Sequence, residues 1–337
     1  MASRLVVLAW HNVEGTWCFP SPIGAGVGGF ARQLRQLRRL ATVVPLESAL
    51  SALRAGEPLP PRAVALTFDD GYRDNLELAV PLLERLGLPC TFFLVPGLLS
   101  REVRPWWEIL AWAFARAGRR TLPWEGGALP TGDQEGHRSF LTVAERLKAL
   151  DRATRERRTD ELVELLEPEG TLDEERLFLD WDGARELVRR GFAVGSHSMY
   201  HAILSREAPD EQLRDLVASR RRLEAELQVP IRLLAYPNGT RADYDAVTMA
   251  AAERAGYRHA LGAHTGLNRR STPGYGHSRL VLQPQRSFSE IIVMCVGSPL
   301  VPARPGHGGG RRADRTRPAG QPPSGGGDVL RRRGPAT

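Results

Sequence analysis

Short apolar runs recur along the chain, and stretches with helical spacing separate them. The runs show little alternation of polar and apolar residues, which is typical of strands covered on both faces in a parallel sheet. The stretches between them, such as residues 30–41 and 75–87, space apolar residues by three or four, and Gly87 is a helix stop. About seven or eight strand–helix repeats, without a Gly-x-Gly-x-x-Gly motif, favour an α/β barrel over an open sheet. The runs are RLVVLAW, TVVPL, AVALTF, CTFFLV, FAVGSH, RLLAYP, HALGA and RLVL.

Polar residues stand directly after several of these runs. In a (β/α) barrel, the functional residues lie at the rim formed by the carboxyl ends of the strands. We therefore expect the residues at those positions to lie around one rim, although they are far apart along the chain. They are His11, Asp69, Asp70, His197 and Tyr236.

Two regions interrupt the repeat. Residues 100–180 combine an aromatic stretch, RPWWEILAWAFARA, with a charged helical stretch, and we interpret them as a helical insertion packed over or beside the barrel mouth. From residue 298 onward Gly, Pro and Arg dominate, so that the segment has too little apolar surface to offset the entropy of ordering. The expected organisation is a barrel over residues 1–297, with the insertion at about 100–180, and a disordered basic tail over residues 298–337.

The net charge of +7 does not predict a nucleic-acid partner, because the arginines crowd the last forty or so residues and the remainder is close to balanced. The three cysteines are widely spaced and form no Cys-x-x-Cys motif, which fits a reducing compartment. The apolar run in MASRLVVLAWHN is too short for a signal peptide or a membrane span. We therefore predict a cytoplasmic protein without a membrane span.

Two histidines and two aspartates together indicate a metal site. His197 and His201 have the spacing His-x3-His, which brings two imidazole rings to one divalent cation. Two imidazoles and one carboxylate form a common catalytic site with an open position for water. The adjacent Asp69 and Asp70 would repel each other, but a cation offsets that repulsion, and the second carboxylate can then accept a proton from the water. The other interpretation of this aspartate pair is a solvated turn before Gly71.

Three motifs stand out in the sequence: TFDDG at residues 67–71, HSMYH at 197–201 and LLAYPNG at 233–239. Together they resemble the polysaccharide deacetylases with a NodB-type catalytic domain, which are metal-dependent carbohydrate esterases, and the resemblance extends from about residue 5 to about residue 282. It implies a distorted (β/α)7 barrel, Asp69 as the catalytic base, and Asp70, His197 and His201 as ligands of the metal. It also implies an N-acetylated glycan as substrate and a link to exopolysaccharide synthesis.

The implied reaction removes an N-acetyl group from an amino-sugar polysaccharide or glycan precursor. A metal-bound water attacks the acetyl carbonyl while Asp69 takes its proton. The expected metal is Zn²⁺, and Co²⁺, Ni²⁺ or Fe²⁺ suit the same ligands. A backbone N–H in the turn containing Tyr236 and Pro237 is the expected second donor to the oxyanion; the turn can also be purely structural.

The sequence departs from the family pattern at two points. Many members carry an arginine in the third motif that orients the base, and this sequence has Ala235 at that position. They also carry a late Leu-x-His motif that supplies the general acid, and no clear equivalent occurs here. We take His264 as the acid. The other histidines considered for this role are His11, His259 and His277.

These departures leave other functions open. One is a sugar-binding protein whose catalysis has decayed, and another is an amide hydrolase for a small substrate that is not a sugar. Trp106 and Trp107 lie at helical spacing, which indicates a core more often than a platform for sugar stacking.

Overall fold

The computed structural model describes residues 3–20 and 26–282. By its internal contacts the chain divides into Met1–Ser298 and Pro299–Thr337. The tail predicted over residues 298–337 lies outside the described residues.

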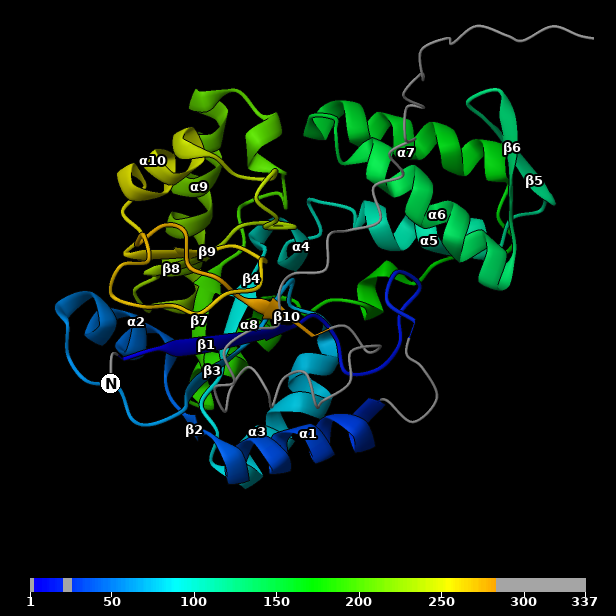
Figure 1. The fold of residues 1–337 in the computed structure, drawn as a ribbon. Helices are drawn as coiled ribbons and strands as arrows, with labels where there is room; N and C mark the ends of the chain where they lie inside the picture. Colours follow the sequence, from blue (N-terminus) through cyan, green and yellow to red (C-terminus); the bar gives the residue numbers. More distant parts are fainter. Residues whose placement is uncertain (1–2, 21–25, 283–337) are drawn as a thin grey trace, which may run out of the picture. The chain divides into compact units, whose positions relative to one another are not determined.

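Parallel strands form a curled sheet, and helices that connect successive strands lie on its outside (Figure 1). Seven strands follow one another in the order β10-β1-β3-β4-β7-β8-β9, and β2 pairs with β3 as an eighth. A parallel bridge between Leu261 and His277 connects the two ends of this order, which confirms the predicted distorted barrel. The strands are β1 (Leu5–Trp10), β2 (Thr42–Val43), β3 (Ala63–Phe68), β4 (Thr91–Leu94), β7 (Ala193–Ser196), β8 (Leu233–Ala235), β9 (His259–Leu261) and β10 (Leu280–Val281).

Amphipathic helices cover the outside of the sheet. In α1, Phe30, Leu34 and Leu37 are buried, as their spacing of three and four requires. The helix before Gly87 ends at this residue, whose positive φ of 63° completes the cap. The covering helices are α1 (Gly26–Leu40), α3 (Val80–Leu86), α8 (Trp181–Arg189), α9 (Pro209–Leu227) and α10 (Ala246–Arg254); a π-helical turn (Asn75–Ala79) precedes α3, and the short α4 (Pro96–Leu99) follows β4.

Helix α2 (Leu46–Ala55) has a different position from the covering helices. Its Leu46 and Leu50 belong to the same buried cluster as Leu5, Ala63 and other residues on the inner side of the strands. Figure 1 shows α2 beside the start of β1, away from the arrowhead. The helix therefore closes the amino-terminal end of the barrel and leaves the carboxyl-terminal rim for the functional residues.

Residues 106–166 form helices and one hairpin around a buried cluster of their own. Phe114, Phe140 and Leu166 lie in this cluster, and it continues to Tyr72 and Phe178 next to the barrel. The elements are α5 (Trp106–Ala115), the antiparallel pair β5 (Thr121–Trp124) and β6 (Gly127–Pro130), α6 (Asp133–Leu147) and α7 (Arg152–Leu166). Across residues 3–20 and 26–282, no helix combines the length and the apolar composition needed to cross a membrane.

Candidate active site

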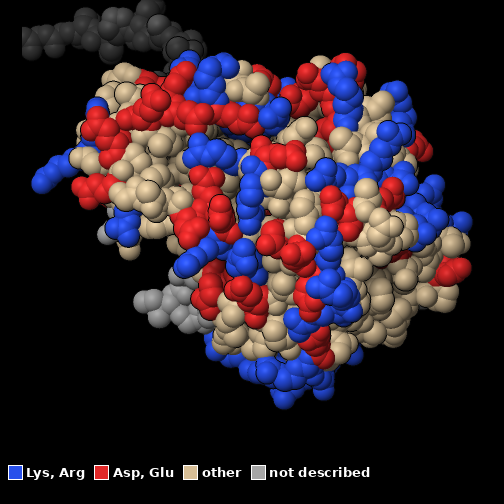
Figure 2. Space-filling view, turned by 180° about the vertical axis from the view of Figure 1, so that it is seen from behind, with Lys and Arg blue, Asp and Glu red and all other residues tan. Residues whose placement is uncertain are grey.

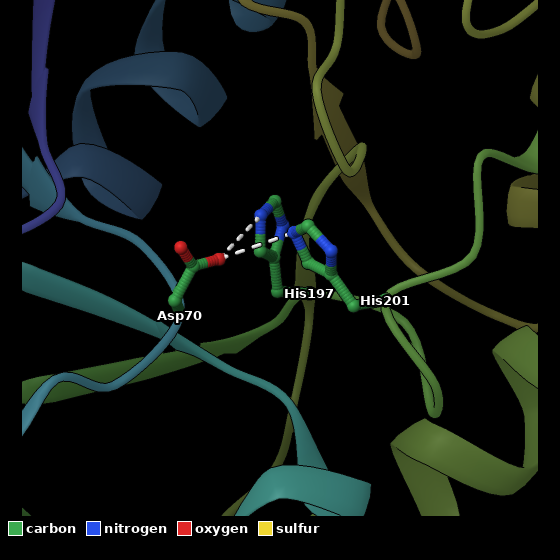
Figure 3. Close-up of side chains that lie close together, drawn as sticks. All are labelled: Asp70, His197 and His201. Carbon is green, nitrogen blue, oxygen red and sulfur yellow. Dashed lines mark ion pairs between the residues drawn. The ribbon is translucent and has the colours of Figure 1, made fainter. Parts of the chain in front are cut away.

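Three buried side chains meet at the carboxyl-terminal rim of the sheet. The Oδ1 atom of Asp70 lies 3.4 Å from Nε2 of His197 and 3.2 Å from Nε2 of His201. Figure 3 shows the Asp70 carboxylate pointing at the two imidazole rings. The possible ligand atoms of the three residues all lie within 4.8 Å of one another. Three of the residues predicted from the sequence are therefore brought together.

The backbone aims these side chains by leaving the strand conformation directly after each strand ends. Asp70 follows β3 with a φ of 69°, and His201 has a φ of 51°; both lie in the left-handed region that non-glycine residues rarely occupy. Such conformations cluster at functional sites, where the surroundings hold them in place. Gly71 has a φ of 77°, and a Cβ atom there would lie 2.9 Å from Leu94.

Hydrogen bonds hold the ring of His197 and the loop between the two histidines. Nδ1 of His197 lies 2.7 Å from the carbonyl oxygen of Ala235. A proton on that nitrogen leaves Nε2 with a lone pair toward Asp70, as a metal ligand requires. Asp215 of α9 accepts the backbone N–H of Met199 at 2.7 Å and so holds the loop between the two histidines. The alanine in the third motif thus contributes its backbone to the site.

The spacing of the cluster fits a cation. Ligand atoms placed about 2.0–2.1 Å from a tetrahedral zinc ion lie about 3.3 Å apart, close to the two contacts of Asp70. Oδ1 of Asp70 is buried and has no hydrogen-bond partner among the described residues, and neither has Nδ1 of His201. Buried polar atoms are normally paired, so an unpaired carboxylate oxygen facing two imidazoles suits a bound cation. Burial lowers the pKa of His201, whereas Asp69 and Asp70 outweigh burial and raise that of His197.

The neighbouring Asp69 is held by an arginine. Nη1 of Arg279 donates to Oδ1 of Asp69 at 2.6 Å, and the two residues are only 1% and 2% exposed. Nε of Arg279 donates to the carbonyl oxygen of Gly262, and the guanidinium lies 5.3 Å from the ring centre of Phe93. Burial acts to raise the pKa of Asp69, but the charge and hydrogen bond of Arg279 and the charge of His197 together outweigh it and lower the pKa below its ordinary value. Asp69 is therefore ionised.

Arg279 is a residue that the sequence reasoning missed. The expected position for an arginine that orients the base was 235, after β8, where Ala235 stands. Arg279 instead immediately precedes β10, at the start of the run RLVL. An arginine beside a predicted strand was a visible signal, but nothing local tied it to an aspartate 210 residues away.

The ring of His201 packs against Trp107, and a chain of hydrogen bonds holds Trp107 in place. The ring of Trp107 lies 4.4 Å from that of His201, centre to centre. Nε1 of Trp107 donates to the hydroxyl oxygen of Tyr72 at 2.9 Å, and this hydroxyl donates to Glu108 at 2.7 Å. Glu108 also accepts from Thr16 at 2.7 Å. Trp106 and Trp107 are only 7% and 6% exposed, which supports the core interpretation over a sugar platform.

The histidines considered for the general acid lie in different places. His11 directly follows β1, and the N–H of Asp69 donates to the carbonyl oxygen of the preceding Trp10 at 2.9 Å, so His11 lies beside the aspartate pair. His264 follows β9 on the same rim, and the hydroxyl of Tyr244 lies 3.3 Å from its Nδ1. Burial, together with the charges of Arg241 and Arg279, lowers the pKa of His264. The role of general acid stays a prediction for His264, with His11 as a second candidate on the same rim.

His259 and His277 are not placed for this role. His259 is the first residue of β9, at the amino-terminal end of the strand, and Nε2 of His277 lies 3.4 Å from its Nδ1. Metal ligands and base follow the carboxyl ends of their strands, so this histidine pair lies toward the other end of the barrel.

The expected oxyanion donor is a backbone N–H in the turn that contains Tyr236 and Pro237, and the contacts of these two residues limit which N–H it can be. The N–H of Tyr236 donates to the carbonyl oxygen of Leu261 at 3.0 Å, which continues the pairing of β8 with β9. Pro237 has no N–H. The hydroxyl of Tyr236 donates to the carbonyl oxygen of Tyr275, so the side chain is buried and occupied as well. Neither residue therefore offers a free donor to an oxyanion.

A curled parallel α/β sheet that brings two histidines and an aspartate together at its carboxyl-terminal rim is an arrangement suited to hydrolases that use a divalent cation. Comparison with known proteins narrows the class. Residues 56–260 match the model of the family described as "Polysaccharide deacetylase". The chain belongs to the polysaccharide deacetylase family, whose members act on carbon–nitrogen bonds and generally depend on a divalent metal.

The chain is similar to the "Putative polysaccharide deacetylase YxkH" of Bacillus subtilis (strain 168), at 21% identity over 248 residues that make up 74% of this chain and 61% of that protein. It is 32% identical to the poly-beta-1,6-N-acetyl-D-glucosamine N-deacetylase of Escherichia coli (strain K12) over 88 residues, which are 26% of this chain and 13% of that one. It therefore spans less than two thirds of either relative. Its fold is similar to that of the Streptococcus pyogenes deacetylase PplD, with a TM-score of 0.58, 17% identity, and 88% of this chain and 100% of that chain covered.

Proposed function

We propose that this protein removes N-acetyl groups from an amino-sugar polysaccharide or a glycan precursor, with a divalent cation held by Asp70, His197 and His201. The observation that carries the proposal is the convergence of these three side chains at one rim, with the ionised Asp69 beside them. Zinc is the proposed cation, since two imidazoles and one carboxylate at this spacing suit its tetrahedral preference. Family membership and the Escherichia coli relative support a glycan as the substrate.

The cation, when bound, supplies a Lewis acid that polarises the acetyl carbonyl and makes water acidic enough to lose a proton near neutral pH. Asp69 is the general base that accepts this proton. Arg279 is a positioning residue, because it holds the Asp69 carboxylate in place and keeps it ionised. Ala235 orients His197 through its carbonyl oxygen, and Asp215 holds the loop that carries His201.

The leaving amine requires a proton, and His264 is its proposed donor, with His11 as a second candidate. His11 lies at the same rim, beside the aspartate pair. Its ring stacks on that of Phe19, with the ring centres 4.8 Å apart. The side-chain amide of Asn75 donates to the backbone carbonyl oxygen of His11 at 2.9 Å, which fixes the backbone at this position.

A decayed sugar-binding protein is a weaker alternative than the sequence alone suggested. It was motivated by the alanine at position 235, but Arg279 provides a guanidinium to Asp69 from elsewhere in the barrel. An amide hydrolase for a small substrate could use the same residues, so substrate tests must separate it from a polysaccharide deacetylase. A cytoplasmic location stays a prediction.

The test combines metal content with acetate release. Wild-type protein, Asp69→Asn and the double variant His197→Ala/His201→Ala are compared after dialysis against zinc. The expected result is that Asp69→Asn retains one equivalent of metal and loses nearly all acetate release, while the double variant loses both. Asp182→Asn is a matched control, because it removes an exposed carboxylate on α8.

Substrates for this test are β-1,4-linked and β-1,6-linked N-acetylglucosamine oligomers and a small N-acetylated amine. Faster hydrolysis of an oligomer supports the polysaccharide substrate, and faster hydrolysis of the small amine supports the alternative. Stoichiometric metal in the double variant would contradict the ligand assignment, and wild-type turnover by Asp69→Asn would contradict the assignment of the base.

A further inference from the structure

A cavity lies away from the proposed metal ligands, at the end of the barrel that α2 closes. Its volume is about 240 Å³. Arg54 in the last turn of α2, His259 at the start of β9, and the segment before β10 line it. Figure 1 shows α2 beside the start of β1, and this end of the sheet is opposite the rim that carries Asp70 and His197. The cavity is therefore separate from the site described above.

Three arginines line this cavity, and its lining contains no aspartate or glutamate. They are Arg54, Arg269 and Arg270. Among residues 3–20 and 26–282, no ion pair or side-chain hydrogen bond joins any of them to another residue. Glu47 of α2 does not serve them, because it pairs with Arg232 and with Arg258. The cavity thus concentrates positive charge.

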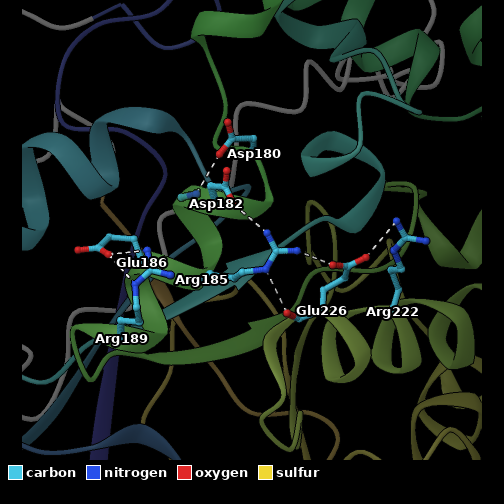
Figure 4. A network of polar contacts seen from close by, with 8 residues as sticks. Asp180, Asp182, Arg185, Glu186, Arg189, Arg222 and Glu226 are labelled. Carbon is cyan, nitrogen blue, oxygen red and sulfur yellow. Dashed lines mark hydrogen bonds and ion pairs between the residues drawn. The ribbon is translucent and has the colours of Figure 1, made fainter.

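Several other surface arginines of this protein have carboxylate partners. Figure 2 shows Lys and Arg interspersed with Asp and Glu over the face drawn there. On α8 and α9, Arg185 lies 2.8 Å from Asp182 and 2.7 Å from Glu226, and Arg222 lies 3.3 Å from the same Glu226 (Figure 4). Paired arginines such as these have a structural partner, whereas the three at the cavity have none among the described residues.

The wall of the cavity also contains a buried histidine with an unused nitrogen. His259 and His277 are 2% and 4% exposed, and they contact each other through Nδ1 and Nε2. Nε2 of His259 lies 3.3 Å from the hydroxyl of Ser51, while Nδ1 of His277 has no partner within the described part of the chain. Burial lowers the pKa of His259 to about 4 and that of His277 to about 3, so both rings are neutral at pH 7. Unpaired buried polar atoms are uncommon and favour a site that is completed by a ligand.

We propose that this cavity binds a phosphate-type oxyanion through the guanidinium groups of Arg54, Arg269 and Arg270. The planar fork of a guanidinium matches the oxygens of a phosphate group, and several forks around one cavity neutralise its charge. The volume is below the ~300–1,000 Å³ of ordinary small-molecule pockets, which suits a small anion or the phosphate end of a larger molecule. Tyr275 also lines the cavity, and burial together with the charge of Glu253 raises its pKa.

The position of the arginines makes a selective test possible. Arg54 belongs to α2, and Arg270 lies over the glycine that ends this helix: a Cβ atom at Gly56 would be 3.0 Å from its Nη1. Both arginines are exposed, so glutamine at these positions leaves the core intact. The double variant Arg54→Gln/Arg270→Gln removes two of the three guanidinium groups. Arg35→Gln is the matched control, because Arg35 is an exposed arginine on α1 that forms no ion pair or side-chain hydrogen bond within the described part of the chain.

Binding is measured by calorimetry on the full chain loaded with zinc, at constant ionic strength, and again with a chelator present. Inorganic phosphate and glycerol 3-phosphate are the two probes. We expect the double variant to bind roughly tenfold more weakly or worse, since it loses two of the three charged donors to the anion. Binding by Arg35→Gln should equal that of the wild type. Affinity for both probes indicates a free phosphate ion, and affinity for the ester alone indicates a phosphate group on a larger ligand.

A second readout locates the bound anion. In spectra of the ¹⁵N-labelled histidine side chains, phosphate should shift the signals of His277 in the wild type and not in the double variant. The proposal is overturned if neither probe binds, if binding disappears with the chelator, if the double variant binds as tightly as the wild type, or if the His277 signals do not move. These outcomes are independent of the deacetylase proposal, because none of them involves acetate release.

Discussion

Replacing Arg279 with methionine should destabilise the protein strongly, because it leaves the buried Asp69 carboxylate without a partner. The two side chains are almost completely buried and their closest atoms are 2.6 Å apart. Removing one member of a buried ion pair typically costs about 3–5 kcal/mol of unfolding free energy. Loss of the bond from Nε to the carbonyl oxygen of Gly262 adds about 1 kcal/mol. We therefore expect Arg279→Met to lower the unfolding free energy by about 4 kcal/mol or more.

A double-mutant cycle separates the ion pair from the packing around it. Asp69→Asn leaves the guanidinium buried without its anion and should also be destabilising. The double variant Asp69→Asn/Arg279→Met leaves no unpaired charge, so its loss should be smaller than the sum of the two single losses by about 1–3 kcal/mol. Arg279→Lys keeps the positive charge and is the conservative control, although lysine cannot reproduce the two directed bonds.

Urea unfolding at about pH 7, with chelator and then with zinc, measures these differences. Two losses that add to within about 0.5 kcal/mol would refute the reasoning, since additivity means that the two side chains do not interact. Activity provides a second test. Because Arg279 does not touch the substrate in this account, Arg279→Lys should retain more acetate release than Arg279→Met, and both should keep the metal.

Two further predictions concern the residues behind the histidines. Burial raises the pKa of Asp215 to about 7, so its ionised form is unfavourable in the folded state, and the unfolding free energy should fall by about 4 kcal/mol as pH rises from about 4 to above 7. Asp215→Asn keeps an acceptor for the Met199 N–H and should flatten this pH dependence, measured by denaturant unfolding. If the variant shows the same pH dependence as the wild type, the carboxyl group is not its cause. Trp107→Phe removes the hydrogen bond to Tyr72 and loosens the ring that packs on His201. The affinity for zinc, measured by competition with a chelator, should therefore fall roughly tenfold or more. An unchanged affinity would mean that Trp107 only fills the core.

The sequence was sufficient for the parts of the site that depend on local order. A parallel strand ends where its apolar run ends, and the first polar residue after it must lie at the rim. Asp70 and His197 could therefore be placed before their contacts were known, and the three-residue spacing brought His201 with them. The left-handed conformations of Asp70 and His201 carry no comparable signal, since neither residue type requires them.

Sequence reasoning was less successful for contacts that are formed by a backbone group or by a long side chain. A backbone N–H in the turn with Tyr236 and Pro237 was expected to face the oxyanion because the turn follows a strand, but the pairing of β8 with β9 continues for one more residue and uses the N–H of Tyr236. The extent of a pairing depends on the neighbouring strand, which lies elsewhere in the sequence. The same holds for the cavity near α2, which is lined by a helix, a strand and a loop from separate parts of the chain.

The case of Ala235 and Arg279 shows why a missing motif residue is weak evidence for lost function. What Asp69 needs is a cation within hydrogen-bonding distance, and a barrel surrounds this position with several strands. Arg279 immediately precedes β10 and donates to Asp69, which immediately follows β3, although β1 lies between these two strands in the sheet. Ala235 meanwhile retains a different task, because its carbonyl oxygen accepts from His197 whatever its side chain is. A search for arginine at one motif position would therefore record a loss, while the charge on Asp69 is compensated from another strand.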